Sequence, residues 1–356
     1  MNCSIILILP YHTYLVGLTR KSAQTSAWLD FEGKPVHLES ASPWLQSLFD
    51  GKHLERVSNS PVMLPDKKDP SEAKYVLNSA VISVERDIIL PGNVKASKGM
   101  LVQVYRADAK NDVSTLKIAT SLDGINWTKH SQAIENPSAT IHYEDPRITV
   151  MSDGRIVMAS TRADKENHIA SIDLSELVEG KFIHLCTVNK EHDEDSDKDG
   201  VLFPQKINGK YALLRRPWPD IKIAYANSLA GPWDLNKDVI MSPRKDRKDN
   251  GWIGGGSVPI LTDCGWFMIY HGVEYHGIPE NKVYRLFGAL LDKDNPADPS
   301  KVLRTSNPIL EPHLRWEKYG GAVPNVVFSC NSIVFEDALW TWYGAADKVI
   351  GAAKRD

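Results

Sequence analysis

The chain has 356 residues, of which 42% are hydrophobic and 24% are charged, and its formal net charge is −3. This composition is that of an ordinary soluble globular protein, and the near-neutral charge argues against a nucleic-acid partner, which requires a surface that neutralises phosphates. The four cysteines are far apart and form no CxxC motif, so neither a zinc site nor a disulfide framework is indicated and no metal is expected.

The N-terminal segment, residues 1–56, begins with the apolar run CSIILILPYHTYLVGL. This run has no basic leader, contains Pro10 and His12, and is shorter than the roughly 20 apolar residues that span a membrane. We therefore expect an early strand, a cytoplasmic location and no membrane partner. Helical patterns are scarce, and residues 43–51 and 171–180 are expected to form at most short turns of helix.

Four later segments share one pattern, in which a turn with a glycine precedes an apolar strand that ends in polar residues. Their glycines are 55, 55 and 56 residues apart: Gly99, Gly154, Gly209 and Gly265. A fifth copy, FEDALWTWYGAAD, has Asp337 in place of the glycine. A period of about 50 residues with three or four strands per unit is typical of β-propeller blades.

The repeats therefore predict an all-β fold, a five-bladed β-propeller that residues 57–356 form as a single domain. Residues 1–56 are expected to be an N-terminal extension that packs on the propeller. A β-sandwich with coincidental spacing is the alternative.

A propeller places equivalent parts of all its blades around one central channel. Polar residues near the ends of the repeat strands should therefore converge: Arg106, Arg162, Arg216, His271 and Asp347. The strands that precede the repeat turns should add Asn78, Ser79, Asp145, Lys206 and the glycines at 254–256.

The motif HYEDPRIT, residues 142–149, contains two adjacent carboxylates. Because side chains alternate along a strand, we expect Asp145 to face the channel, Glu144 to face away and Arg147 to return to the side of Asp145 and hold its carboxylate. The channel would then hold one isolated acid among several basic side chains. Glycoside hydrolysis usually needs two carboxyl groups, whereas a ring of cations suits phosphate, a nucleophile that needs positioning but no general base. Surface ion pairs, and a turn-forming role for an Asp before Pro, are the alternatives.

Three other segments have weaker signals. The acidic run HDEDSDKDG, residues 192–200, lacks the final glutamate of an EF-hand loop, so a solvated acidic loop is expected. The glycines at 254–256 should allow a close backbone approach to a ligand or a positive φ. The polar loop RKDRKDNG, residues 244–251, is expected near the channel mouth, where it would contact a longer substrate.

Four motifs, in order along the chain, resemble those of the mannoside phosphorylases of glycoside hydrolase family 130: HYEDPRIT, DGVLFPQKINGKYALLRRP, GGGSVPILTDCGWFMIYHGV and YGAADKVIGAA. The resemblance implies a five-bladed β-propeller enzyme, a glycosyltransferase-type phosphorylase that reversibly cleaves β-mannosides with inversion to α-mannose 1-phosphate. Its implied substrates are a manno-oligosaccharide and inorganic phosphate, with no further cofactor. The resemblance leaves a homo-oligomer open.

The same resemblance implies roles for individual residues. The motif YEDPR implies that Asp145 is the catalytic acid and passes its proton through a mannose hydroxyl. The mannosyl unit would be held by Asn78, Ser79, Arg106, Tyr143 and Asp347. Phosphate would be held by Arg162, Lys206, Arg216 and His271.

Hydrolases of this family carry a glutamate near the segment written here as IGGGSVP and read YNG where this chain reads YHG. Both departures favour phosphate over water. A β-mannosidase, a mannosyltransferase that uses nucleotide-activated mannose and a non-enzymatic propeller lectin remain alternatives. Both β-1,2 and β-1,4 linkages remain open.

Overall fold

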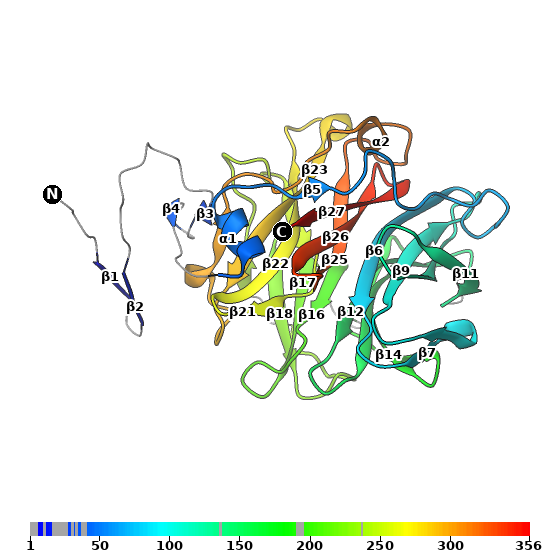
Figure 1. The fold of residues 1–356 in the computed structure, drawn as a ribbon, viewed down its shortest axis with the longest axis horizontal. Coiled ribbons are helices and arrows are strands. Elements are labelled where there is room, and N and C mark those ends of the chain that lie inside the picture. The colour runs from blue at the N-terminus through cyan, green and yellow to red at the C-terminus, as the bar shows by residue number, and fades with distance from the viewer. Residues whose placement is uncertain are drawn as a thin grey trace.

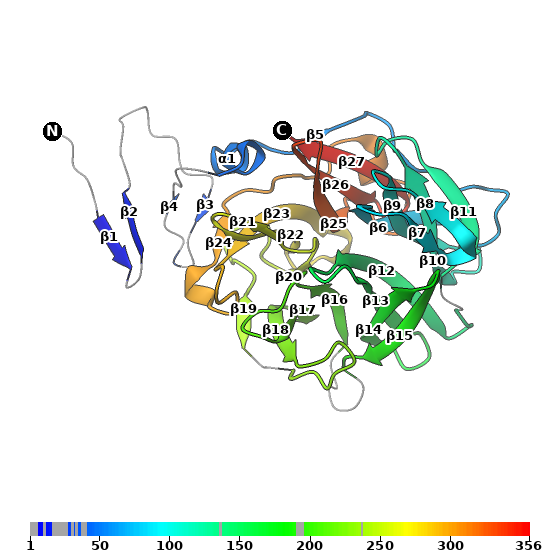
Figure 2. The ribbon, with the colours of Figure 1, turned by 60° about the horizontal axis from the view of Figure 1, so that its bottom comes forward.

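The computed structural model describes residues 41–134, 137–189, 196–235 and 238–356, together with residues 6–9, 12–15, 28–29, 32 and 35–36. Five antiparallel sheets follow one another along the chain and lie side by side (Figure 1). Seen from another side, their first strands gather at the centre and their last strands at the rim (Figure 2). The predicted five-bladed β-propeller is confirmed.

In each blade the first strand along the chain is the innermost. Blade 1 contains β6 (Tyr75–Ser83), β9 (Leu101–Asp108), β10 (Ser114–Ser121) and β11 (Thr128–Ala133). Blade 2 contains β12 (Ile141–Val150), β13 (Ile156–Asp164), β14 (Ile169–Val178) and β15 (Lys181–Thr187). Blade 3 contains β16 (Asp197–Leu202), β17 (Tyr211–Pro217), β18 (Ile221–Ala226) and β19 (Val239–Met241).

Blade 4 contains β20 (Trp252–Gly255), β21 (Ile260–Thr262), β22 (Gly265–Glu274), β23 (Val283–Leu291) and β24 (Leu303–Thr305), and β3 (Trp28–Leu29) and β4 (Pro35–Val36) extend its outer edge. Blade 5 contains β25 (Val327–Phe335), β26 (Ala338–Ala345), β27 (Val349–Arg355) and β5 (Glu55–Arg56). Smaller elements are β1 (Ile6–Leu9), β2 (His12–Leu15), β7 (Ile88–Leu90), β8 (Val94–Ala96), α1 (Pro43–Phe49), α2 (Arg315–Lys318) and the 3-10 turns Pro91–Asn93, Pro279–Asn281 and Pro299–Lys301.

The repeat glycines occupy the same structural position in four blades. The first three lie in the tight turn before a long strand and Gly265 begins β22, and all four have a positive φ, 89°, 86°, 80° and 132° in chain order. In blade 5 the equivalent Asp337 also has a positive φ, 61°. The sequence period is therefore the period of one turn that requires a left-handed residue, which glycine adopts without strain and Asp tolerates.

The core consists of apolar layers between neighbouring blades. Residues of β9 and β10 pack against β12 and β13, for example, and the same arrangement repeats around the ring. Helix α1 joins the layer between blades 4 and 5, where the rings of Trp44 and Phe267 lie 5.0 Å apart. Strand β5 closes the ring by pairing with β27.

The expectation of a helical turn at residues 171–180 is wrong, because most of this segment belongs to β14. Ile172 and Leu174 are buried between blades 2 and 3. Ser171, Asp173 and Ser175, which alternate with them, lie on the other face of the sheet. In the part of the chain that the structure describes, no helix has the length and apolar character needed to cross a membrane.

Candidate active site

The inner strands of the first three blades carry the same irregularity. The strand register shifts between Leu77 and Ala80, between Glu144 and Arg147, and between Lys198 and Val201. The first extra residue of each bulge has a left-handed backbone: Asn78 (φ 46°), Asp145 (φ 50°) and Asp199 (φ 55°). Bulges redirect side chains, and Asn and Asp adopt this backbone more readily than most residues. Three neighbouring blades therefore place an equivalent amide or carboxylate side chain on the inner strand.

Asp145, the predicted catalytic acid, is 9% exposed. Its Oδ1 accepts a hydrogen bond from Nδ2 of Asn78 at 2.8 Å and lies 3.8 Å from Nη1 of Arg106. Burial raises the pKa of Asp145; the charge of Arg106 opposes this effect and that of Glu144 adds to it. A raised pKa keeps a carboxyl group protonated at higher pH, as a general acid requires.

Glu144 does not face away from Asp145, contrary to expectation. Its Oε2 lies 3.3 Å from Nη1 of Arg106, the nitrogen that Asp145 also approaches, and its Oε1 accepts a hydrogen bond from Lys165 at 2.6 Å. Although burial alone would raise it, the charges of Arg106, Lys198 and Lys165 hold the pKa of Glu144 at about 2. The alternation rule fails here because the bulge interrupts it.

Arg106 is the common partner of a group of carboxylates. Its Nε donates to Asp108 at 2.9 Å, in addition to its contacts with Glu144 and Asp145. Asp347 lies in the left-handed turn between β26 and β27 (φ 48°). Burial raises the pKa of Asp347 to about 7; Arg106 opposes the rise, and Asp145, Asp108 and Glu144 add to it. The expectation of one isolated acid is therefore wrong, because four carboxylates surround this guanidinium.

The other two residues predicted to bind the sugar are next to this group in sequence, and Tyr143 packs on the apolar layer between blades 1 and 2. Ser79 is fully buried, and its Oγ accepts a hydrogen bond from Nε2 of Gln103 at 2.8 Å. Tyr143 is partly exposed on β12, two residues before Asp145.

A second buried cluster surrounds Asp199. Its Oδ1 accepts a hydrogen bond from Nη2 of Arg147 at 2.9 Å, and its Oδ2 lies 2.7 Å from Nε of Arg216 and 3.4 Å from Nε2 of His271. Although burial would raise it, these basic groups hold the pKa of Asp199 well below its usual range. Burial lowers the pKa of His271 to about 3 against the opposing effect of Asp199, so the imidazole is neutral.

Arg147 connects the two clusters. Its Nη1 donates to the main-chain oxygen of Asp145 at 2.8 Å, and its Nη2 also donates to the main-chain oxygen of Gly255 at 2.8 Å. The expectation that Arg147 holds the carboxylate of Asp145 is wrong, since its carboxylate partner is Asp199.

The structure does not place Lys206 in either cluster. Lys206 is exposed, and its Nζ lies 4.7 Å from the ring centroid of Tyr211 at the start of β17. Arg216 is five residues further along that strand, or about 16 Å at roughly 3.3 Å per residue. Lys198 instead pairs in register with Arg216, and its Nζ lies 3.9 Å from Oε2 of Glu144. The lysine that the geometry brings to the site is therefore Lys198.

Arg162 is one residue out of register with its expected counterparts. Arg106 and Arg216 each pair with the residue just before a bulge, but in blade 2 that position pairs with Thr161, and Arg162 pairs with Tyr143. A shift of one residue directs a side chain to the other face of the sheet. Within the described ranges, Arg162 makes no hydrogen bond or ion pair with the Asp199 cluster.

Lys198 and Asp199 lie in the acidic run that was expected to be a solvated loop. Residues 190–195 fall outside the described part of the chain, but residues 197–200 belong to β16, where Asp197 is fully buried and pairs with Arg215 at 2.5 Å. The expectation is therefore wrong for residues 197–200. A short repeat in the sequence could have located Asp199. Asn-Ser at 78–79, Asp-Pro at 145–146 and Asp-Gly at 199–200 each follow a short strand segment and precede an apolar run.

Gly254 allows the Asp199 cluster to form. A Cβ atom at this position would lie 2.3 Å from Oδ2 of Asp199 and 2.4 Å from Cε1 of His271. None of the glycines at 254–256 has a positive φ. These positions are therefore glycine because neighbouring atoms pack closely against them, and not because the backbone needs a left-handed residue.

The Asp199 cluster contains a polar atom that the protein does not satisfy. Nδ1 of His271 is buried and has no hydrogen-bond partner among the described residues, whereas Oδ2 of Asp199 and Nε of Arg216 form an ion pair at 2.7 Å that lacks hydrogen-bond geometry. Buried polar groups are almost always hydrogen-bonded, so the free nitrogen of His271 points to a polar ligand. The described residues contain no group of three or more His, Cys, Asp or Glu side chains suited to a metal ion.

The chain is similar to known phosphorylases over most of its length. The model of glycoside hydrolase family 130, described as β-1,4-mannooligosaccharide phosphorylase, matches residues 50–356. A 1,2-β-oligomannan phosphorylase and a β-1,2-mannobiose phosphorylase, both from Thermoanaerobacter sp. (strain X514), are each 37% identical to it, and each alignment covers 84% of this chain and 96% of the relative.

A solved structure shows the same fold. The β-1,2-mannobiose phosphorylase of Listeria innocua, in complex with β-1,2-mannobiose, superposes with a TM-score of 0.68 at 24% identity, covering 85% of this chain and 96% of that one. The family model and the two relatives settle the classification: the chain belongs to glycoside hydrolase family 130.

Proposed function

We propose that this enzyme cleaves β-1,2-linked mannosides by phosphorolysis with inversion and releases α-mannose 1-phosphate. The observation that carries the proposal is the junction at Arg147, where a buried acid with a raised pKa adjoins a buried site rich in cations. The β-1,2 linkage is supported by the two relatives at 37% identity, whereas a β-1,4-mannooligosaccharide phosphorylase of Ruminococcus albus is 28% identical.

The carboxylate group around Arg106 suits a mannosyl unit. Asn78 and Arg106 offer donors to sugar hydroxyls, and Asp347, with a pKa of about 7, exists in both protonation states near neutral pH. Asp145 donates its proton, through a mannose hydroxyl, to the oxygen that leaves. The bond between that oxygen and the anomeric carbon breaks as the proton arrives.

The Asp199 cluster suits phosphate. Arg216 and Lys198 supply positive charge, and neutral His271 can donate one N–H to a phosphate oxygen. Asp199 holds Arg147, Arg216 and His271 in place through the contacts given above. The bound phosphate forms the new bond to the anomeric carbon from the face opposite the leaving oxygen, which inverts the configuration.

Hydrolysis fits the site less well. A hydrolytic base must accept a proton from water, but the pKa of Asp199 is well below its usual range because of its cationic partners. A side chain at Gly254 would have to displace Asp199 and His271, and family hydrolases carry a glutamate nearby.

The test uses β-1,2- and β-1,4-mannobiose, each with and without inorganic phosphate. We expect phosphate-dependent formation of α-mannose 1-phosphate from the β-1,2 isomer. Free mannose formed equally well without phosphate would establish a hydrolase, and binding without either product would establish a lectin. Product formation only from the β-1,4 isomer would overturn the linkage assignment and leave the phosphorolysis intact.

A further inference from the structure

Glu144 is a buried carboxylate that the proposed reaction does not use. It is 4% exposed and directly precedes Asp145, the proton donor, on β12. Its basic partners come from three neighbouring blades: Arg106 on β9, Lys165 in the turn after β13 and Lys198 on β16. Because a buried charge is costly unless it is paired, these partners are what keep an ionised group beside a carboxyl group that must carry a proton.

The two oxygens of Glu144 have separate partners. Oε1 accepts a hydrogen bond from Nζ of Lys165 at 2.6 Å, while Oε2 lies 3.3 Å from Nη1 of Arg106 and 3.9 Å from Nζ of Lys198. Although burial alone would raise it, the charges of Arg106, Lys198 and Lys165 hold the pKa of Glu144 at about 2. Glu144 therefore presents a fixed negative charge to Arg106 at any pH near neutrality.

Glu144 and Asp145 approach the same nitrogen atom of Arg106. Nη1 lies 3.3 Å from Oε2 of Glu144 and 3.8 Å from Oδ1 of Asp145. Asp108 takes the other edge of the guanidinium, where it accepts hydrogen bonds from Nε at 2.9 Å and from Nη2 at 3.3 Å. Since 3.8 Å is too long for a hydrogen bond, Glu144 and Asp108 are the close partners of the guanidinium and Asp145 is not.

The contacts of the Asp145 carboxyl group suit its protonated form. Its Oδ1 accepts a hydrogen bond from the neutral amide of Asn78 at 2.8 Å, and Arg147 donates to the main-chain oxygen of Asp145 and not to its carboxyl group. Burial raises the pKa of Asp145; Arg106 opposes the rise and Glu144 adds to it. A closer approach of Arg106 would favour the ionised form.

Other titratable groups surround the same pair of carboxyl groups. They lie on β12 or on neighbouring elements: Asp108, Lys198, Cys330, Asp347, His142, Arg147 and Asp199. Burial raises the pKa of the Cys330 thiol and lowers that of His142, so both groups are uncharged at neutral pH. Asp199 has basic partners of its own. Glu144 is set apart by its contact with the nitrogen that Asp145 also approaches.

Resting on the phosphorolysis proposed above, we propose that Glu144 is a positioning residue for the proton donor. By occupying Nη1 of Arg106, it keeps the guanidinium from pairing with Asp145, so Asp145 begins each turnover protonated. Without Glu144, the freed nitrogen of Arg106 would pair with Asp145, 3.8 Å away, and hold it as a carboxylate. A carboxylate has no proton to donate to the sugar hydroxyl.

The test is the pH profile of kcat/KM for β-1,2-mannobiose at saturating phosphate, in the wild type and in Glu144→Gln. The rate falls as pH rises through the pKa of the acid, and Glu144→Gln should move this basic limb about one pH unit lower. The rate on the acidic side should change much less. A substitution that only weakened the structure would instead lower the rate at every pH.

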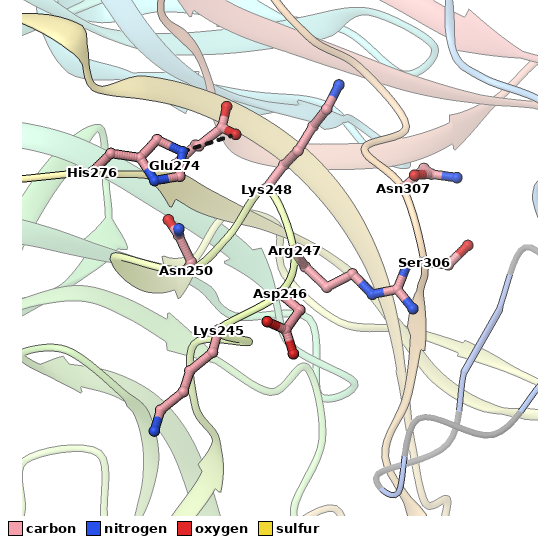
Figure 3. A pocket seen from close by; sticks show the side chains of 9 residues that line it. All are labelled: Lys245, Asp246, Arg247, Lys248, Asn250, Glu274, His276, Ser306 and Asn307. Atoms are coloured by element: carbon pink, nitrogen blue, oxygen red, sulfur yellow. Dashed lines mark hydrogen bonds and ion pairs between the residues drawn. The ribbon is translucent and has the colours of Figure 1, made fainter.

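Glu274→Gln is the matched control. Glu274 also pairs with an arginine, Arg285 at 2.7 Å, and it lies beside His276 in the wall of a cavity of about 340 Å³ on blade 4 (Figure 3). Within the described ranges, neither partner contacts Arg106 or Asp145. This variant removes the same charge from another paired glutamate, so it should leave the basic limb where it is.

A second variant and a second measurement complete the test. Glu144→Asp keeps the charge on a shorter side chain, so its shift should have the same sign and a smaller size, and it serves if the amide variant does not fold. Carboxyl ¹³C NMR follows Asp145 directly, because its signal is the one missing from Asp145→Asn. It also separates Asp145 from Asp347, whose pKa burial and, to a smaller extent, Glu144 raise to about 7.

The outcomes separate this proposal from the proposed function. If the wild-type enzyme forms no mannose 1-phosphate, the phosphorolysis itself is wrong. If it does, but the basic limb and the Asp145 signal titrate at the same pH in the wild type and in the Glu144 variants, Glu144 has no positioning role and the phosphorolysis stands. A limb that moves while the Asp145 signal does not would assign the shift to Asp347 and overturn the proposal in the same way.

Discussion

The two halves of the site have opposite electrostatic designs. Around Arg106, four carboxylates share one guanidinium, and the pKa values of Asp145 and Asp347 are raised. Around Asp199, one carboxylate meets Arg147, Arg216 and His271, and its pKa is lowered. In the first half, burial is the main cause of the raised pKa values and neighbouring acids add to it, although three cationic partners keep Glu144 ionised. In the second half, basic partners keep the buried carboxylate of Asp199 charged. One half is thus suited to donating a proton and the other to binding phosphate.

The two halves differ in the residue just before the bulge. The bulge of blade 2 carries Asp145 next to Glu144, whereas the bulge of blade 3 carries Asp199 next to Lys198. They also differ in their partners, since Asp199 contacts Arg147, Arg216 and His271. Removing one residue from either half should therefore change a different kinetic parameter.

The largest expected effect comes from the acid half. Asp145→Asn removes the proton and keeps the volume and the contact with Asn78, so kcat should fall about 10³-fold while mannoside binding is retained. Initial rates and calorimetric binding of mannobiose measure the two quantities. Asp123→Asn, a surface carboxylate in a blade 1 turn, is the control. Activity within tenfold of wild type would show that another group supplies the proton.

Lys198 lies where the two halves meet, because its charge lowers the pKa of both Asp199 and Glu144 and its Nζ lies 3.9 Å from Oε2 of Glu144. Lys198→Ala should raise the KM for phosphate roughly 10- to 100-fold, as the loss of a charged hydrogen bond implies, with a smaller change in the KM for mannoside. Lys206→Ala is the matched control, because Lys206 packs on Tyr211 away from the cluster. Steady-state kinetics with each substrate varied will decide between them. A larger effect of Lys206→Ala on phosphate would refute the assignment of Lys198.

The fold was readable from the sequence because each blade repeats a left-handed turn. Gly99, Gly154, Gly209 and Gly265 mark that turn directly. The segment 171–180 was misread as a helical turn although residues 171–175 alternate polar and apolar side chains, as a strand does, with Ile172 and Leu174 in the core.

The site was only partly readable, because its residues lie in bulges that alternation does not describe. Asp145 precedes its repeat glycine by 9 residues and Asp199 by 10, but Asn78 precedes Gly99 by 21, since β7 and β8 are inserted between them. Alignment by the turn glycines therefore missed Asp199 and Lys198. A bulge adds residues to one strand only, so a pattern of fixed period cannot locate the side chains that follow it.

A moderate effect is expected where the cation half is closest packed. In Gly254→Ala, the new methyl group would force Asp199 and His271 apart, so stability should fall by about 1–3 kcal/mol and the KM for phosphate should rise. Urea unfolding and phosphate kinetics measure the two effects. Gly209→Asn is the control, because a Cβ atom there meets nothing within 4 Å and Asn tolerates a positive φ. Unchanged phosphate kinetics in Gly254→Ala would show that the cluster has room to relax.

The smallest expected effect is the pH dependence of stability from the acid half. The pKa of Asp347 is about 7 in the folded protein and 3.8 for the unperturbed group. Between these values the folded state binds more protons than the unfolded state, so stability falls as pH rises from about 4 to about 7. Asp145, whose pKa is also raised, contributes in the same direction.

Asp347→Asn isolates this contribution, because an amide does not titrate. Since Asp347 is partly exposed, its share of the fall in Tm from pH 4.5 to pH 7.5 is expected to be on the order of 2 °C, and the variant should lose that share. Glu144 and Asp199 do not confuse the comparison, because their lowered pKa values place their effect on stability below pH 4.5. An equal fall in Tm in the variant and the wild type would mean that Asp347 is ionised throughout this range, and that Arg106 neutralises its charge more effectively than burial opposes it.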